Sequence, residues 1–241
     1  MRKIFIFIVL IALTTGFAIA QNKNVAVVTF FINKEIDVTE FGAPAYLAVK
    51  KLGDDPAFNL APMLSSFHKQ FMDEYSKSFP FNLLPEDQVI KNEAYKAYTP
   101  VGIANSGILN ATNFLIPVNG YKIFLNMAGH ENEKNMLKIF NQADGVMDVT
   151  INFKLVKIGL GGMGVVKVNA NATMTLFNKN GDKVFSVDQD AKSKSVSPLV
   201  GGVPVMTPEK IMPMCESAMA ELMVSLQKDL PKMIKKADAK L

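Results

Sequence analysis

Two stretches in the middle of the chain, residues 146–158 and 165–177, alternate between apolar and polar side chains. A period of two is the pattern of a β-strand with one buried face. The residues between them are mostly glycine, so the pair predicts a long antiparallel hairpin. A further turn signal, Asn180-Gly181, leads into KVFSVD, which we expect to be the next strand.

Other apolar runs predict the rest of the sheet. VAVVTFFI, from Val25, is almost continuously apolar, which favours a central strand covered on both faces by helices. FPFNLLP places a short strand between two prolines. Asn119-Gly120 between FLIPV and YKIFL predicts a hairpin, with Pro117 at an edge or bulged position. Residues 99–113 read as a loop with at most one helical turn.

Helical periodicity follows a loop that contains Gly42, Pro44 and the residues GDDP. Apolar residues then recur at spacings of four and three, which predicts an amphipathic helix. EDQVIKNEAYKAY and ENEKNMLKIFNQADG predict two short helices, the first with acidic residues in its first turn. The stripe of the first, longer helix consists of Leu60, Leu64, Phe67, Phe71 and Tyr75.

The end of the chain predicts a glycine- and proline-containing loop, SPLVGGVPVMTP, and then a long helix. Thr207 is a suitable cap and Pro208 suits the first turn, although Pro213 could delay the regular helix. Pro231 is expected to end or kink the helix, leaving KMIKKADAKL as a basic tail. The stripe of this helix consists of Ile211, Cys215, Ala218, Leu222, Leu226 and Leu230.

These elements predict an α/β fold: a mixed sheet with a long antiparallel hairpin, flanked by helices that include a long C-terminal helix. Residues 1–20 are expected to be a cleaved signal peptide, because a basic start is followed by an apolar run and the small residues AIA. An uncleaved anchor helix is the alternative. Residues 21–241 contain no internal repeat and are expected to form a single α/β domain, periplasmic or secreted.

Charge and cysteine content narrow the class of partner. The formal net charge is +4, and removal of Arg2 and Lys3 with the signal would lower it to +2. No basic cluster with interleaved aromatic residues occurs, so we expect no nucleic acid partner. The single cysteine, Cys215, excludes an internal disulfide. The residue after the predicted cleavage site is Gln21, whereas lipid attachment would need a cysteine there.

The stretch KIGLGGMGVV satisfies G-x-G-x-x-G at Gly159, Gly161 and Gly164. A dinucleotide site needs a helix after these glycines, because the helix N-terminus holds the pyrophosphate. The residues that follow alternate as a strand does, and the acidic residue about twenty positions on is Asp182, in a turn. We therefore expect a hairpin connection and no cofactor.

Candidate catalytic and metal-binding residues are few. His68 lies beside an apolar helical stripe and is expected to be a structural histidine. His130 with Glu131 and Glu133 could form a weak cation site, although a solvated loop is favoured. Cys215 falls on an apolar helix face, where a free cysteine behaves as a small hydrophobic residue. The sequence thus predicts no catalytic, cofactor or metal site.

Two glycine-bearing apolar loops remain, GLGGMG and PLVGGVPVM. Apolar side chains exposed at a turn can mark a contact site, and methionine adapts to varied partners. Leu160 and Met163 are therefore the candidate contact residues. The alternative is that these loops fold onto the rim of the sheet.

The order of the segments resembles an α/β domain of bacterial envelope proteins. NVAVVTF, NLLPEDQVIKNEAY, ADGVMDVTINF and MTLFNKNGDKVFS, followed by a terminal helix, are similar to the domain shared by curli secretion-channel lipoproteins, the amino-terminal domain of TolB and the lipoprotein activators of penicillin-binding proteins. The resemblance implies a mixed sheet, roles in assembly and scaffolding, and no catalytic residues. The chain departs from this family in lacking the lipidation cysteine.

The sequence therefore predicts an exported, non-enzymatic binding or scaffolding protein of the cell envelope. Its expected partner is a protein or an envelope component, and contact with a membrane surface is an open alternative. One alternative is a pore-forming or membrane-inserting secretion component, because strands of 13 residues exceed the ~9–11 that cross a bilayer. A hydrolase of unidentified type is the other alternative.

Overall fold

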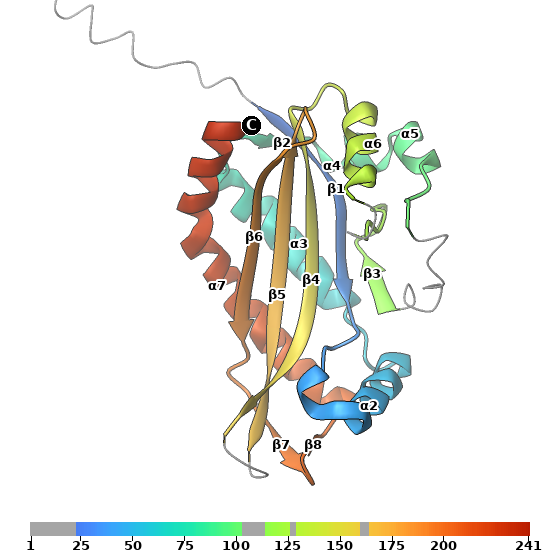
Figure 1. Cartoon of the computed structure of the whole chain (residues 1–241), viewed down its shortest axis with the longest axis vertical. Coiled ribbons are helices and arrows are strands. Elements are labelled where there is room, and N and C mark those ends of the chain that lie inside the picture. The colour runs from blue at the N-terminus through green and yellow to red at the C-terminus, as the bar shows by residue number, and fades with distance from the viewer. Residues whose placement is uncertain (1–22, 103–113, 126–128, 160–163) are drawn as a thin grey trace, which may run out of the picture.

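The computed structural model describes residues 23–102, 114–125, 129–159 and 164–241. Eight strands form one mixed sheet, in the order β2-β1-β4-β5-β7-β8, with β3 beside β1 and β6 beside β5 (Figure 1). This is the α/β class that the sequence predicts. The strands are β1 (Asn24–Asn33), β2 (Asn82–Leu83), β3 (Leu115–Pro117), β4 (Gly145–Ile158), β5 (Val165–Asn178), β6 (Lys183–Lys192), β7 (Ser197–Val200) and β8 (Val203–Pro204).

Strand β1 lies inside the sheet, as its apolar run predicts. It pairs in parallel with β2 and β4 and antiparallel with β3. All eight of its inner residues are buried, from Val25 to Ile32. Neighbours on both edges and helices on both faces account for the absence of polar alternation in this strand.

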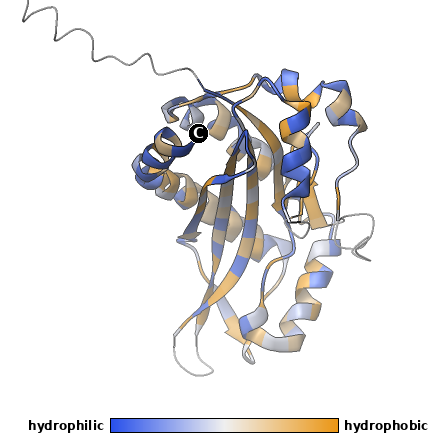
Figure 2. Cartoon of the chain, turned by 45° about the horizontal axis from the view of Figure 1, so that its top comes forward, coloured by the Kyte–Doolittle hydropathy of each residue, from blue (hydrophilic) through white to orange (hydrophobic). Residues whose placement is uncertain are grey.

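The long predicted hairpin is confirmed. Strands β4 and β5 have 14 residues each and pair from Gly145 with Asn178 to Ile158 with Val165. Apolar and polar residues alternate along them, as the bands in Figure 2 show. Strand β6 follows the turn at Gly181, whose φ of 81° suits glycine, and pairs antiparallel with β5.

One face of the sheet is covered by two helices, α3 (Ala61–Asp73) and α7 (Pro208–Lys240). The apolar residues of β4 and β5 and the predicted stripes of both helices form the main core. Leu64, Phe67 and Phe71 of α3 and Leu222 of α7 are each at most 4 % exposed. Both predicted amphipathic helices are confirmed.

Three short helices cover part of the opposite face: α4 (Glu86–Ile90), α5 (Glu93–Ala97) and α6 (Glu131–Ile139). The predicted single helix over residues 86–98 is thus two helices, separated at Lys91 and Asn92. Asn92 caps α5 by accepting a hydrogen bond from the Tyr95 backbone N–H at 3.0 Å. These helices enclose a second, smaller core around Tyr95, Met136 and Phe140.

The segment predicted as a loop around Gly42 and Pro44 is a helix, and that expectation was wrong. Helix α2 (Gly42–Asp54) follows a single 3-10 turn, η1 (Thr39–Phe41). Ala45, Val49 and Leu52 recur at helical spacing and are buried against the core. The proline stands in the first turn, where its missing N–H costs no hydrogen bond.

The hairpin predicted around Asn119-Gly120 does not form. Strand β3 pairs with β1 instead, matching Ile116 with Ile32, and the chain after Gly120 makes one bridge, from Lys122 to Thr29. Because β1 offers an open edge beyond β2, tertiary pairing displaces the local hairpin. Pro117 does lie in an edge strand, as predicted.

Two expectations about the end of the chain also need correction. SPLVGGVPVMTP is a small hairpin rather than a loop, with β7 and β8 joined by Gly201 and Gly202, which both have positive φ. Pro231 does not end α7, which runs without interruption to Lys240. The predicted basic tail is helical.

Candidate functional site

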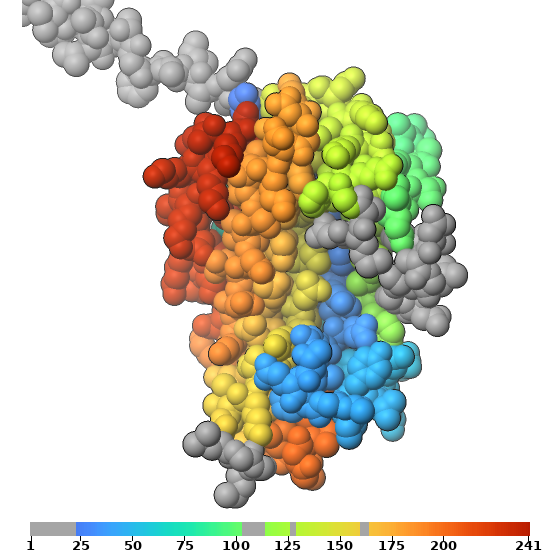
Figure 3. Space-filling view, in the orientation of Figure 1, coloured from blue at the N-terminus to red at the C-terminus, as the bar shows by residue number. Residues whose placement is uncertain are grey.

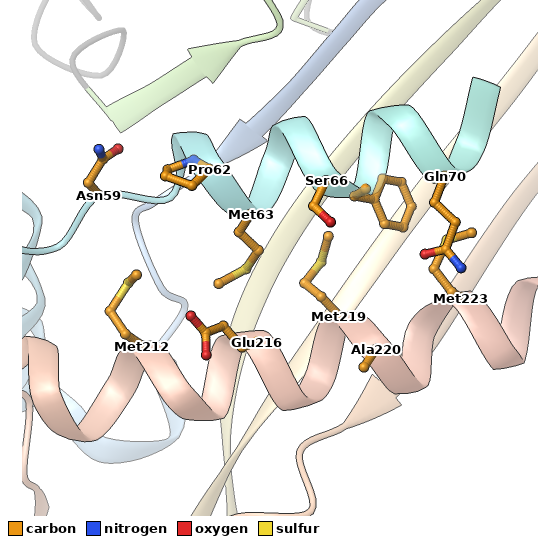
Figure 4. A pocket seen from close by; sticks show the side chains of 11 residues that line it. Asn59, Pro62, Met63, Ser66, Gln70, Met212, Glu216, Met219, Ala220 and Met223 are labelled. Atoms are coloured by element: carbon orange, nitrogen blue, oxygen red, sulfur yellow. The ribbon is translucent and has the colours of Figure 1, made fainter. Parts of the chain in front are cut away.

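A groove of about 490 Å³ lies between α3 and α7 (Figure 4). Its size is within the range of about 300–1,000 Å³ that is typical of ligand pockets. Four methionines line it, one from α3 and three from α7: Met63, Met212, Met219 and Met223. These flexible, polarizable side chains can repack around different apolar shapes.

Polar groups stand at the edge of this methionine groove. Ser66 and Gln70 come from α3 and Glu216 from α7, and Figure 4 shows their side chains directed toward the space between the helices. Glu216 is the one charged side chain among the described residues that line it. The groove therefore suits an apolar group with a hydrogen-bond donor or a cation beside it, and disfavours an anion.

The groove exists because the two helices pack on the sheet rather than on each other along their whole length. Helix α3 buries the Leu64, Phe67 and Phe71 stripe, so Met63 and Ser66 are left on its flank. The same holds for α7, whose stripe is on the sheet and whose Met212 is only partly buried. The sequence analysis did not identify these methionines as a group. The signal available in the sequence was the helical spacing between them and the apolar stripes of α3 and α7.

His68 belongs to an aromatic cluster, as expected of a structural histidine. Its ring packs edge-on against Phe30 with centroids 4.9 Å apart and lies 6.0 Å from Tyr121. Nε2 is 3.1 Å from Oε1 of Glu86, but without the alignment of a hydrogen bond. Burial lowers the pKa of His68, and the negative charge of Glu86 only partly opposes this.

His130 and Glu133 lie close together at the start of α6, the short helix that ENEKNMLKIFNQADG predicts, rather than in a solvated loop. His130 precedes α6 with a φ of 64°, and its Nδ1 is 3.9 Å from Oε2 of Glu133. Glu133 is 2 % exposed and faces Asp148 of β4, which is 7 % exposed. Burial, the charge of Glu133 and a hydrogen bond with it hold the pKa of Asp148 well above its usual range.

The raised pKa favours the protonated form of the buried Asp148 carboxyl, which with Glu133 forms a buried acid pair. One oxygen of Asp148, Oδ1, has no hydrogen-bond partner. Across the part of the chain that the structure describes, no three histidine, cysteine or acidic residues are placed to hold a metal ion. Glu131 does not join the pair, since it is exposed at the start of α6.

Cys215 is completely buried on the apolar face of α7, where the sequence placed it. Burial raises the pKa of its thiol far above the usual range, and Glu216 adds to this effect. A thiol in this environment stays protonated and is a poor nucleophile.

The glycine segment connects two strands. Gly159 follows β4 with a φ of 119°, and Gly164 leads directly into β5. No helix N-terminus follows, so the G-x-G-x-x-G pattern is not a dinucleotide-binding loop. The candidate contact residues Leu160 and Met163, and Gly161, lie outside the described residues, as does the predicted signal peptide at residues 1–20.

None of the helices in the described part of the chain combines the length and the apolarity that a membrane span requires. The apolar face of α7 is turned toward the sheet.

No family model matches this chain, and no curated protein matches it. Among solved structures it is similar to lipoprotein GNA1162 from Neisseria meningitidis, with 15% identity over 71% of this chain and 83% of that one and a TM-score of 0.31. A putative neuraminyllactose-binding hemagglutinin homolog from Helicobacter pylori has 9% identity over 90% of both chains and a TM-score of 0.39. The hypothetical protein CT253 from Chlamydia trachomatis has 10% identity over 87% of this chain and 98% of that one, with a TM-score of 0.33. At these identities and scores no ligand or partner is transferred to this chain, and no specific family is confirmed.

Proposed function

We propose that this chain is an exported, non-enzymatic binding or scaffolding protein of the bacterial cell envelope, which holds an apolar segment of a partner protein in the methionine groove. Export is supported by the order of charge, apolar run and small residues at positions 1–20. The observation that carries binding is the groove itself, open to solvent between α3 and α7 and lined by four methionines.

An amphipathic helix is the partner element that fits best. A helix lays one apolar face into a groove of this kind and keeps its polar face in water. Glu216 beside the groove favours a partner helix that carries lysine or arginine next to its apolar stripe. The same carboxylate makes a fatty acid a poor ligand.

The hydrolase and pore alternatives gain less support. The thiol of Cys215 is buried in the core, and neither His68 nor His130 is placed beside it. The apolar faces of β4 and β5 lie beneath α7 and α3, where they are part of the protein core. A lipid-exposed hairpin would require α7 to leave the sheet.

The experiment is site-specific photo-crosslinking in intact cells from position 66, since Ser66 is exposed and directed into the groove. We expect one crosslinked partner, which should disappear when Ala220→Trp fills the groove. Ala220 is an exposed lining residue, so this change leaves the core intact. Ala239→Trp, exposed on the same helix outside the groove, is the matched control. An adduct that survives Ala220→Trp would contradict the proposal.

A further inference from the structure

The methionine groove contains sulfur where an ordinary apolar groove contains branched hydrocarbon side chains. Among the described residues that line it there is no leucine, isoleucine or valine, and apart from the four methionines the apolar ones are Pro62, Phe67 and Ala220. Leucine fills about the same volume as methionine and has better-defined rotamers. It is also the residue that both helices place in the core, at Leu64 and Leu222. The groove is therefore distinguished by its thioether sulfurs rather than by its apolarity.

The sulfurs come from both sides of the groove. Figure 4 shows Met63 directed from α3 toward α7, and Met219 directed from α7 toward α3. Met223 follows Met219 by four residues and Met212 precedes it by seven, so all three lie on the same side of α7. Side chains four apart on a helix have Cβ atoms about 5–6 Å apart, and methionine is unbranched and flexible. Thioethers from both helices can therefore turn toward one ion.

One carboxylate stands beside these sulfurs. Glu216 lies between Met212 and Met219 on the same side of α7, four residues after the first and three before the second. None of the ion pairs in the described part of the chain includes it. A single carboxylate without a partner cation compensates one positive charge, so a monovalent ion leaves the groove neutral and a divalent ion does not.

The groove can be reached from solvent. It lies on the face of the sheet opposite to the one seen in Figure 3, where β5 and β6 face the viewer and α7 runs along their edge. Ser66, Glu216 and Ala220 in its lining are exposed. Met219 and Met223 are only 5% and 4% exposed, so an ion that enters here exchanges water for sulfur.

We propose that the methionine groove binds a soft monovalent metal ion, Cu(I), between Met63 and Met219, with Glu216 balancing its charge. Thioethers are soft ligands that select Cu(I), whereas magnesium, calcium and manganese prefer oxygen ligands. Thioethers also suit an exported protein, because they form no disulfides in an oxidising compartment, where thiols do. Metal binding uses the groove of the proposed function but needs no partner protein, so either can fail without the other.

The test is competition for Cu(I) between the mature protein and the coloured chelator bicinchoninate, without oxygen and with ascorbate present. We expect the protein to withdraw a single ion per chain from the coloured complex. Met63→Leu/Met219→Leu should weaken binding at least roughly tenfold, a loss that changes behind a metal ligand already cause. Leucine conserves the volume of methionine, so the fold and the apolar groove are retained. Met72→Leu is the matched control, since Met72 lies on α3 outside the groove.

Two further measurements identify the ligands. In the unchanged protein Ag(I), a soft monovalent ion without redox chemistry under these conditions, should shift the methyl resonances of Met63 and Met219 and leave that of Met72 in place. Cys215 is another soft ligand, but it is buried outside the groove lining. Cys215→Ala should therefore bind Cu(I) as the unchanged protein does.

Four results would overturn metal binding by the groove: no withdrawal of Cu(I) from the chelator, equal affinity in the double methionine variant, displacement of Cu(I) by an equal concentration of Zn(II), or loss of the ion in Cys215→Ala. The proposed function is tested separately in the same double variant. Its groove remains apolar, so the partner crosslinked from position 66 should persist although Cu(I) is lost. Loss of the crosslink with Cu(I) retained in the unchanged protein would contradict the proposed function alone.

Discussion

The hydroxyl of Tyr75 donates a hydrogen bond to the backbone carbonyl of Leu226 at 3.2 Å, across 151 positions of sequence. It also lies 3.2 Å from the sulfur of Met233. The contacts bracket Pro231, which removes a backbone donor from the interior of α7. A buried tyrosine therefore fixes the helix on both sides of the proline, and Met233 stays in the core at 2% exposure.

We predict that Tyr75→Phe lowers the free energy of unfolding by about 0.5–1.5 kcal/mol, the usual net contribution of a hydrogen bond. Urea unfolding followed by circular dichroism measures it. Tyr46→Phe is the control, because Tyr46 is 47% exposed on α2. Equal stability of the Tyr75 variant and the parent would mean that packing alone holds the end of α7.

Leu222→Ala should destabilise the protein by about 2–5 kcal/mol, because the removed side chain leaves a cavity in the core. Leu222 is completely buried between α7 and the sheet. Val224→Ala, on the exposed side of the same helix, should cost far less. A thermal transition that is the same for Leu222→Ala and the parent would show that α7 is not part of the cooperative core.

The acid pair predicts a pH dependence with a definite sign. The folded protein holds the Asp148 proton more tightly than the unfolded chain, where an aspartate has a pKa of about 3.9. The free energy of unfolding therefore falls as the pH rises from about 4 toward the raised pKa. Over this range the unfolded chain releases the proton, whereas the folded protein must either retain it or bury a charged carboxylate. Glu133 from α6 and Tyr95 from α5 are titratable groups that interact with it.

Asp148→Asn should remove this decline. We expect the variant to gain about 1–3 kcal/mol over the parent at pH 7, the typical cost of an unsatisfied buried polar group, and little at pH 3. Unfolding curves at several pH values give the difference, and Asp238→Asn on the exposed face of α7 is the control. A gain that is the same at pH 3 and pH 7 would contradict the raised pKa of Asp148.

Dinucleotides should not bind to the glycine segment. The strand β5 that follows Gly164 offers no helix N-terminus for a pyrophosphate. NAD, FAD or ATP should therefore leave the melting temperature unchanged, whereas a ligand at one hundred times its Kd would stabilise by about 2.7 kcal/mol. Any upward shift with a dinucleotide would reverse this conclusion.

Leu160 and Met163 remain the contact residues that the sequence predicts. Their replacement by serine should leave the melting temperature unchanged, because side chains in the predicted hairpin connection would contribute little to a core. Association with a partner or membrane surface should weaken, which crosslinking and flotation with lipid vesicles would measure. Loss of the folded state in this double variant would show that the two side chains are structural.

Periodicity in the sequence was sufficient for the elements that bury one regular face. The alternation in residues 146–177, the continuous apolar run of β1 and the stripes of α3 and α7 each reflect a local geometry that repeats along the chain. Cys215 could be placed in the core for the same reason. Such patterns can be recognised in the sequence alone, because the backbone geometry of a helix or strand sets which side chains share a face.

Tertiary structure decided what depends on contacts between distant segments. Strand β3 left its local hairpin because β1 presented an open edge, and α7 continued past Pro231 because Tyr75 and the core hold its second part. The acid pair joins α6 to β4, and the methionine groove needs two helices that are more than a hundred residues apart in sequence. The two apolar loops could each be seen in the sequence, but only the pairing of β5 with β7 places Val165, just after the first loop, beside Pro198 of the second.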